Sequence, residues 1–75
     1  MHIGEYIRRK LKEQGHTITW LANEYGCTRA NIYKLLDKPT MDTGTLFRFS
    51  LILCFDFFKL YTEELERRRD LSVNE

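Results

Sequence analysis

The sequence predicts a single, small, all-helical domain. Its 75 residues are enough for one domain only. Apolar residues recur at intervals of three and four along most of the chain, and threonines and glycines stand where helices would begin and end. Residues 46–58 are rich in Phe, Leu and Ile, but they do not alternate with polar residues and no second segment could pair with them. We therefore predict helices and no strand.

Five helices are expected, with boundaries set by apolar spacing and by capping residues. They cover residues 3–14, 18–25, 29–36, 43–54 (or 45–54) and from 57 onward. Thr17 and Thr28 are expected to cap the second and third helices and Asp56 the fifth, while Gly15 stops the first. The apolar faces of the first four helices are expected to hold Ile3, Tyr6, Ile7, Leu11, Ile18, Leu21, Ala22, Tyr25, Ile32, Leu35, Leu36, Leu46, Phe49 and Leu53. The apolar face of the fifth helix is expected to hold Phe57, Phe58, Leu60, Tyr61 and Leu65.

Charge is distributed unevenly along the chain, although the net charge is only +1. Residues 1–40 hold seven basic and four acidic side chains, a balance of +3, whereas residues 41–75 hold five and seven, a balance of −2. A positive N-terminal half suits a phosphate backbone, and the alternative is an ordinary solvated surface. Residues 1–65 are expected to form the domain, and residues 66–75 a charged tail that is either a helix extension or disordered.

No catalytic, metal or membrane signal is found in the sequence. Cys27 and Cys54 form no CxxC pair, and His2 and His16 have no ligand-type neighbours, so no metal or cofactor is expected. The two cysteines are expected to be small buried residues in a reducing compartment. Residues 1–11 are too charged for a signal peptide, residues 51–58 are too short to span a bilayer, and we expect a cytoplasmic protein that is not an enzyme.

The most informative stretch is residues 17–38. Ala22 is small where two helices would cross closely, Gly26 suits a turn that needs a positive φ, and Thr28 can begin the next helix. This arrangement is typical of a helix-turn-helix, whose second helix enters the major groove of DNA. Helical angles place four residues on the outward side of that second helix: Ala30, Tyr33, Lys34 and Asp37.

The sequence of this stretch, TITWLANEYGCTRANIYKLL at residues 17–36, resembles the helix-turn-helix of the lambda-repressor and Cro-like (XRE) family. Residues 3–8 resemble the opening helix of that family, and residues 46–60 its fourth and fifth helices. The resemblance implies a five-helix lambda-repressor-like DNA-binding domain with its helix-turn-helix at helices 2 and 3. It also implies a sequence-specific transcriptional regulator of double-stranded DNA, expected to be a repressor.

The resemblance also implies roles for individual residues. It assigns base-edge contacts to Thr28, Arg29, Ala30 and Lys34, to which we add Tyr33 from its outward position. It assigns phosphate contacts to Thr17 and Ile18, to which we add Thr19, Asn31 and Lys38. The chain departs from the family at three positions: Ile18 replaces a common glutamine, and Leu11 and Leu36 replace an Arg–Glu pair that joins helices 1 and 3.

Two alternatives stay open at this point. Arg29 and Lys34 are either base-reading side chains or simple solvent charges. The chain is either a DNA-binding regulator or a protein-interaction module, such as an antitoxin or an adaptor, for which Trp20 and the apolar fourth helix leave room. Trp20 lies off the apolar stripe of its helix and is expected to be partly exposed. It either packs locally or contacts a partner protein.

The fourth helix is apolar almost all round, because only Arg48 and Ser50 interrupt it. The fifth helix is expected to cover part of that surface, and a symmetric homodimer to cover the rest. A dimer would also present two recognition helices about 34 Å apart to two half-sites of DNA. It forms either in solution or only on DNA. The alternative is a monomer with a fully covered core. The expected interface residues are Phe47, Leu51, Ile52, Phe58 and Tyr61.

Overall fold

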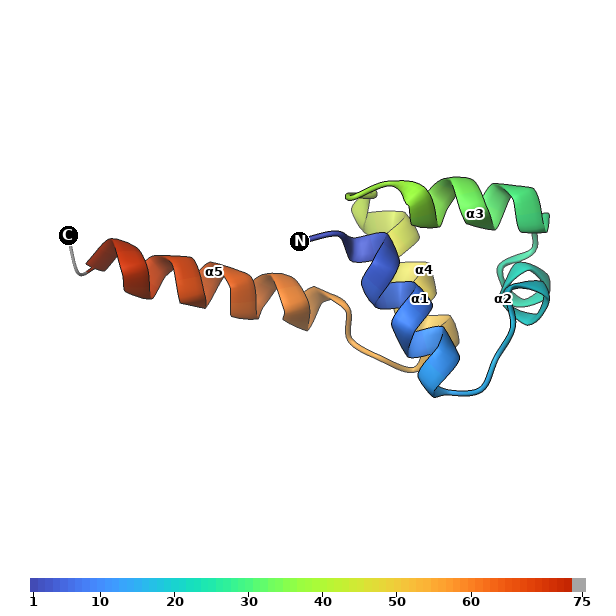
Figure 1. Ribbon diagram of the computed structural model, residues 1–75, viewed down its shortest axis with the longest axis horizontal. Helices are drawn as coiled ribbons and strands as arrows, with labels where there is room; N and C mark the ends of the chain where they lie inside the picture. The colour runs from blue at the N-terminus through green and yellow to red at the C-terminus, as the bar shows by residue number, and fades with distance from the viewer. Residues whose placement is uncertain (74–75) are drawn as a thin grey trace.

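The computed structural model describes residues 1–73, with side-chain detail for residues 1–69. Within that range the chain forms five α-helices and no strand, so the predicted all-helical class is confirmed. The helices, shown in Figure 1, are α1 (Ile3–Glu13), α2 (Ile18–Tyr25), α3 (Arg29–Asp37), α4 (Thr43–Leu53) and α5 (Phe58–Val73).

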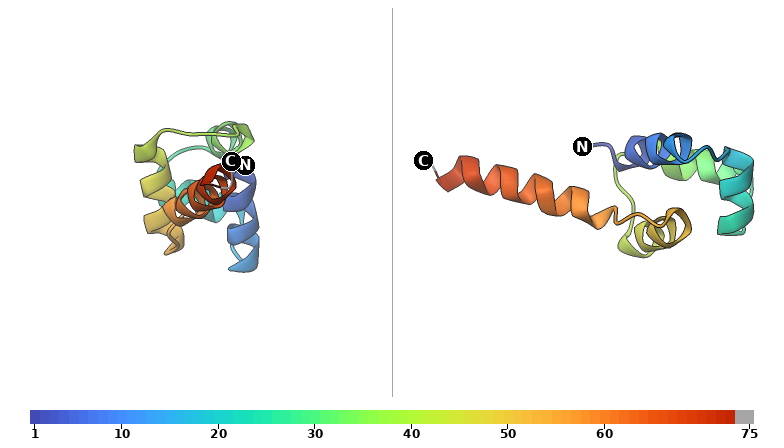
Figure 2. Two further views of the ribbon diagram at one scale, coloured as in Figure 1. Left: turned by 90° about the vertical axis from the view of Figure 1, so that its left-hand side faces the viewer. Right: turned by 90° about the horizontal axis from the view of Figure 1, so that it is seen from below.

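Helices α1 to α4 form a compact body around one apolar core. The α3 helix packs on α1 and α2, and α4 closes the body by packing on α1 and α2 (Figures 1 and 2). Among residues 1–69, every buried side chain is apolar: Ile3, Ile7, Leu11, Leu21, Ala22, Ile32, Leu36, Leu46, Phe49, Leu53 and Phe57. The core is thus made by the residues that helical spacing selects, together with Phe57 in the turn before α5.

Local capping explains where α2, α3 and α4 begin. The hydroxyl oxygens of Thr17 and Thr28 accept hydrogen bonds from Trp20 N–H and Asn31 N–H at 3.0 and 3.1 Å. Asp42 caps α4 in the same way, with 2.7 Å between its carboxylate oxygen and the Thr45 nitrogen. These hydrogen bonds satisfy backbone donors that have no partner inside the helix.

The turn between α2 and α3 has the backbone conformation that the sequence predicts. Gly26 ends α2 with φ 86° and ψ 34°, and its N–H donates to the Ala22 carbonyl. This left-handed conformation is open to glycine at little cost. Gly15, which follows the C-cap of α1, also has a positive φ, of 77°.

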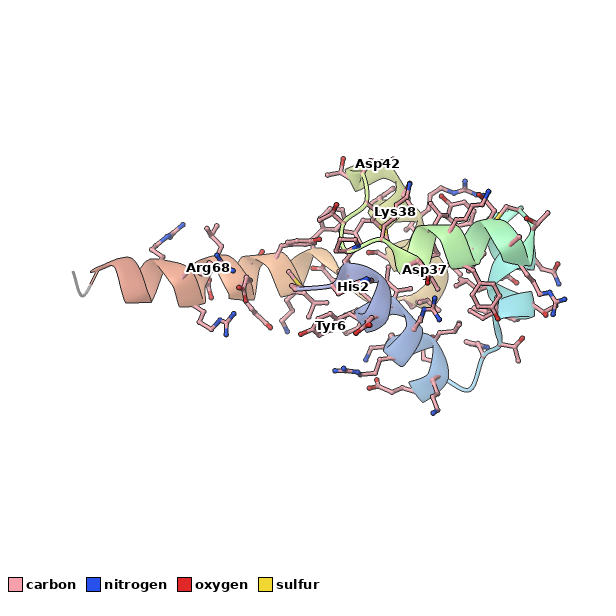
Figure 3. All side chains as sticks on the ribbon, turned by 45° about the horizontal axis from the view of Figure 1, so that its top comes forward. His2, Tyr6, Asp37, Lys38, Asp42 and Arg68 are labelled. Atoms are coloured by element: carbon pink, nitrogen blue, oxygen red, sulfur yellow. The ribbon has the colours of Figure 1, made fainter. Side chains whose placement is uncertain are left out.

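The N-terminus of α1 contacts the C-terminal end of α3 at very close range. A Cβ built on Gly4 would lie 1.8 Å from the carbonyl oxygen of Leu36, so only glycine fits there. Ile3 N–H donates to the Pro39 carbonyl at 3.0 Å, and the His2 ring lies 3.1 Å from the Asp37 carbonyl. Figure 3 shows His2 beside the end of α3. These contacts satisfy carbonyl groups near the C-terminal end of α3 and fix its position relative to α1.

Helix α5 leaves the body after its first turn and projects as an arm (Figures 1 and 2). The molecule measures 47 × 21 × 18 Å, and its radius of gyration of 13.9 Å exceeds the roughly 11.4 Å expected for a compact 75-residue domain. The first turn alone packs against the core, through Phe58 and Leu60. The helix continues through residues 66–73 of the predicted tail, and residues 74 and 75 lie outside the described residues.

Several side chains lie elsewhere than predicted. Tyr6, which was expected on the apolar face of the first helix, is exposed. Tyr61 and Leu65, on the predicted apolar face of α5, are exposed as well. Phe57 precedes α5 instead of beginning it, although Asp56 does accept the expected hydrogen bond, from Phe58 N–H.

The two cysteines are also misplaced in the prediction. Cys54 is exposed and Cys27 is half-buried. Cys54 takes the left-handed C-cap position of α4, with φ 50°, which turns the chain out of the core at that point. The prediction that both are buried is therefore wrong.

Candidate nucleic-acid interface

All five residues predicted to contact base edges are exposed on α3 or at its N-terminal end: Thr28, Arg29, Ala30, Tyr33 and Lys34. Ile32 and Leu36 are fully buried on the inner face of the helix, and Leu35 is half-buried. Ala30, Tyr33 and Lys34 lie on the outer face, whereas Thr28 is the N-cap and Arg29 is the first residue of the helix. A surface helix with one buried face therefore presents two cations, an aromatic ring and small side chains to solvent.

The helix that precedes α3 brings the predicted phosphate-contacting residues to the surface. Thr17 and Thr19 are exposed at the start of α2, and Ile18 is half-buried against the core. The partly buried side chain of Ile18 contributes packing and has no polar group for a phosphate. Asn31 and Lys38 are exposed on and just after α3. Thr17, Thr19, Asn31 and Lys38 thus remain available for polar contacts.

Arg48 on α4 contacts the end of α2, just before the turn to α3. Its guanidinium donates a hydrogen bond to the Tyr25 carbonyl and lies 3.9 Å from the centre of the Tyr25 ring. The contact satisfies a carbonyl at the end of α2 and adds a cation–π interaction. Sequence reasoning missed this role, because Arg48 and Tyr25 come together only when α4 packs across α2.

Arg8 on α1 contacts the outer face of α3. Its Nη2 lies 2.5 Å from Asp37 Oδ1, and its guanidinium carbon lies 5.6 Å from the centre of the Tyr33 ring. Leu11 and Leu36, which occupy the positions of the Arg–Glu pair in the family that the sequence resembles, are both buried. An apolar contact inside and an ion pair at the surface therefore join α1 and α3. Arg8 is engaged in that ion pair, so it is a weaker candidate for a phosphate contact than Lys38.

Trp20 has a local partner. Its ring stacks on His16, with 3.6 Å between ring centres and 6° between planes. The side chain is half-buried and also packs against the core. Local packing accounts for Trp20 and leaves no need for a partner protein at this position.

The predicted dimer residues divide into two groups. Phe47, Leu51 and Tyr61 are exposed, whereas Ile52 and Phe58 are half-buried against the core. Phe58 lies between two hollows, one lined with Phe47 and Leu51 and the other lined with Tyr61. The exposed residues therefore belong to a surface that runs from α4 to the base of α5.

Among the described residues, no group of three or more His, Cys, Asp or Glu side chains is placed to hold a metal ion. No described helix is long and apolar enough to cross a membrane. Hydrogen bonds from the Thr45 backbone and side chain hold the pKa of Asp42 below its ordinary value.

Searches of protein-family models, curated proteins and solved structures find no match to this chain.

Proposed function

We propose that this chain is a sequence-specific, double-stranded DNA-binding protein of the helix-turn-helix type, with a lambda-repressor-like arrangement of helices, and that it regulates transcription, most simply as a repressor. In this proposal α3 enters the major groove. The observation that carries it is the exposed surface of α3, with Lys34 on its outer face and Arg29 at its N-terminal end, while Ile32 and Leu36 on the inner face are fully buried.

The chemistry of this face supports base recognition. An α-helix fits the major groove, and a guanidinium can donate two hydrogen bonds to guanine O6 and N7. Arg29 lies in the first turn of α3, where the end of the helix can approach base edges, and Lys34 follows more than one turn later. Tyr33 adds an aromatic ring beside them. These side chains supply donors and apolar contacts, which are the groups that read base edges.

Contacts to the phosphate backbone are proposed on both sides of α3. Thr17 and Thr19 lie at the start of α2, and Lys38 follows α3 directly. The Arg8–Asp37 pair supports this assignment, because Asp37 is the only acid within α3 and a cation lies against its carboxylate. An unpaired carboxylate at that point would repel phosphate.

A salt titration of duplex binding tests the proposal. The logarithm of the binding constant should fall with the logarithm of salt concentration by roughly 0.9 for each neutralised phosphate. Lys34→Ala should weaken binding, whereas Lys59→Ala, which removes an exposed cation at the base of α5, should leave it unchanged. Failure to bind a random duplex pool at low salt would contradict the proposal and favour a protein-interaction module.

A further inference from the structure

The side chains that α3 presents to solvent offer many hydrogen-bond donors and few free acceptors. The charged groups of Arg29 and Lys34 can only donate. Asp37 is the only carboxylate of α3, and Arg8 holds it in an ion pair. The hydroxyl oxygen of Thr28 already accepts the hydrogen bond that caps the helix. The amino groups of adenine and cytosine need acceptors in the major groove, so this surface favours guanine and thymine, whose O6 and O4 atoms accept.

Two groups suited to apolar contact lie between those donors. Helical spacing places Ala30 and Tyr33 one turn apart on the outer face of α3, and both are exposed. Lys34 lies on one side of this pair and Arg29 on the other. Asn31, which carries an amide oxygen, lies on the opposite side of the helix from Tyr33. An exposed ring beside an alanine is a surface on which a methyl group can pack, and thymine presents its 5-methyl group in the major groove.

The Tyr33 ring is held from α1. The guanidinium carbon of Arg8 lies over the ring, 5.6 Å from its centre, and the same guanidinium pairs with Asp37 one turn further along α3. The two helices are themselves in close contact at Gly4 and Leu36. Arg8 thus covers one face of the ring, while 43% of the Tyr33 residue stays open to solvent. A ring that is already held loses less conformational entropy when it contacts a base.

We propose that the Tyr33 ring reads the 5-methyl group of a thymine in the major groove and that Arg8 is the residue that positions the ring. This inference rests on the proposed DNA-binding function and adds to it the base composition of the bound site. The thymine lies beside the guanines that suit the donors of Arg29 and Lys34. Ala30 leaves room for the methyl group, because a longer side chain there would hold the ring away from the base.

Replacement of single thymines by uracil tests the methyl contact, because uracil pairs as thymine does and lacks only the 5-methyl group. The probe is the duplex that wild type enriches from a random library. At one thymine of the enriched motif, uracil should weaken binding about threefold to fivefold, the loss expected when one methyl group is no longer buried. A motif without thymine, or one in which no single uracil lowers affinity, would overturn this inference and leave the DNA-binding function standing. Failure to bind the random pool would overturn the proposed function and this inference with it.

Three variants assign the contact to the ring of Tyr33. Tyr33→Ala should bind the thymine and uracil duplexes equally, and its circular dichroism should match wild type because Tyr33 lies outside the core. Tyr33→Phe keeps the ring and should keep the preference for thymine. Lys34→Ala is the matched control from the same face: it should bind both duplexes more weakly with their ratio unchanged. Full preference in Tyr33→Ala, or its loss in Tyr33→Phe, would show that the ring does not read the methyl group.

The ratio of the two affinities also tests the positioning role of Arg8. Arg8→Ala should reduce the preference for thymine over uracil to less than about twofold, because the ring is no longer held. Arg8→Lys keeps a cation beside Tyr33 and Asp37 and should recover part of the preference. A role in the fold or in the overall charge would change both affinities equally. An unchanged ratio in Arg8→Ala would therefore overturn the positioning role.

Discussion

The guanidinium of Arg8 on α1 reaches the carboxylate of Asp37 at the end of α3, with 2.5 Å between Nη2 and Oδ1. The side chains are 40% and 70% exposed, so the pair stabilises the fold by no more than about 1 kcal/mol. Its larger effect is electrostatic. It sets a cation against the only acid of α3 and beside Tyr33, on the face proposed to meet DNA.

Replacing Arg8 should therefore affect DNA binding through Asp37. We expect Arg8→Ala to weaken duplex binding by about twofold to fivefold, equivalent to about 0.5–1 kcal/mol. The loss should shrink in an Asp37→Asn background, where no carboxylate is left uncompensated. Fluorescence anisotropy of the four combinations measures this coupling. Equal losses in both backgrounds would show that Arg8 acts directly on phosphate.

The close approach of Gly4 to Leu36 predicts a strong effect of a single methyl group. Gly4→Ala must move a backbone carbonyl, so the free energy of unfolding should fall by about 2–3 kcal/mol. Gly44→Ala is the matched control: its Cβ would lie 3.4 Å from an Asp42 side-chain oxygen, within ordinary contact distance. Alanine favours the helix there and should raise stability by up to about 1 kcal/mol. Urea unfolding followed by circular dichroism compares the free energies of unfolding of the two variants. If Gly4→Ala leaves the free energy of unfolding unchanged, the close contact between α1 and α3 is wrong.

Removing Arg48 should loosen the turn that orients α3. Arg48→Ala loses the hydrogen bond to the Tyr25 carbonyl and the cation–π contact, which together predict a loss of about 1–2 kcal/mol in unfolding free energy. Hydrogen exchange at the Gly26 and Cys27 amides should accelerate more than exchange within α1. Lys59→Ala serves as the control for removing a surface cation. Unchanged exchange in the turn would mean that Arg48 does not hold it.

The Asp42 cap predicts an acid-sensitive contribution from α4. Its pKa is depressed in the folded state, so the contribution is complete above the unfolded pKa of about 4 and is lost as pH falls through the lower folded pKa. Asp42→Asn keeps an acceptor that cannot titrate, and its unfolding midpoint should vary less with pH below about 4 than that of wild type. Asp42→Ala should be destabilised at neutral pH. Parallel pH profiles for wild type and Asp42→Asn would contradict this assignment.

Features that depend on a few neighbouring residues were predictable from the sequence. The caps at Thr17 and Thr28 and the left-handed turn at Gly26 each follow from local backbone chemistry, and each is confirmed. The exposed face of α3 was predictable for a related reason, since Ile32 and Leu36 identify the buried side. Periodicity within one helix is enough to separate its two faces.

Features that depend on how helices cross were not predictable. The Arg8–Asp37 pair joins residues 29 positions apart, on the same two helices that approach each other at Gly4 and Leu36. The projection of α5 was missed for a different reason. Apolar spacing shows that Tyr61 and Leu65 favour burial, but it does not distinguish the core of the same chain from the surface of another.

The most direct test of the central claim is a selection of bound sequences from a random duplex library, carried out in parallel with wild type and Arg29→Ala. We predict that wild type enriches one motif. Arg29→Ala should lose about 1–3 kcal/mol of binding free energy on that motif and lose preference at a single base position, while its affinity for random DNA changes little. If wild type enriches no motif, or if Arg29→Ala weakens specific and random DNA equally, then α3 does not read bases.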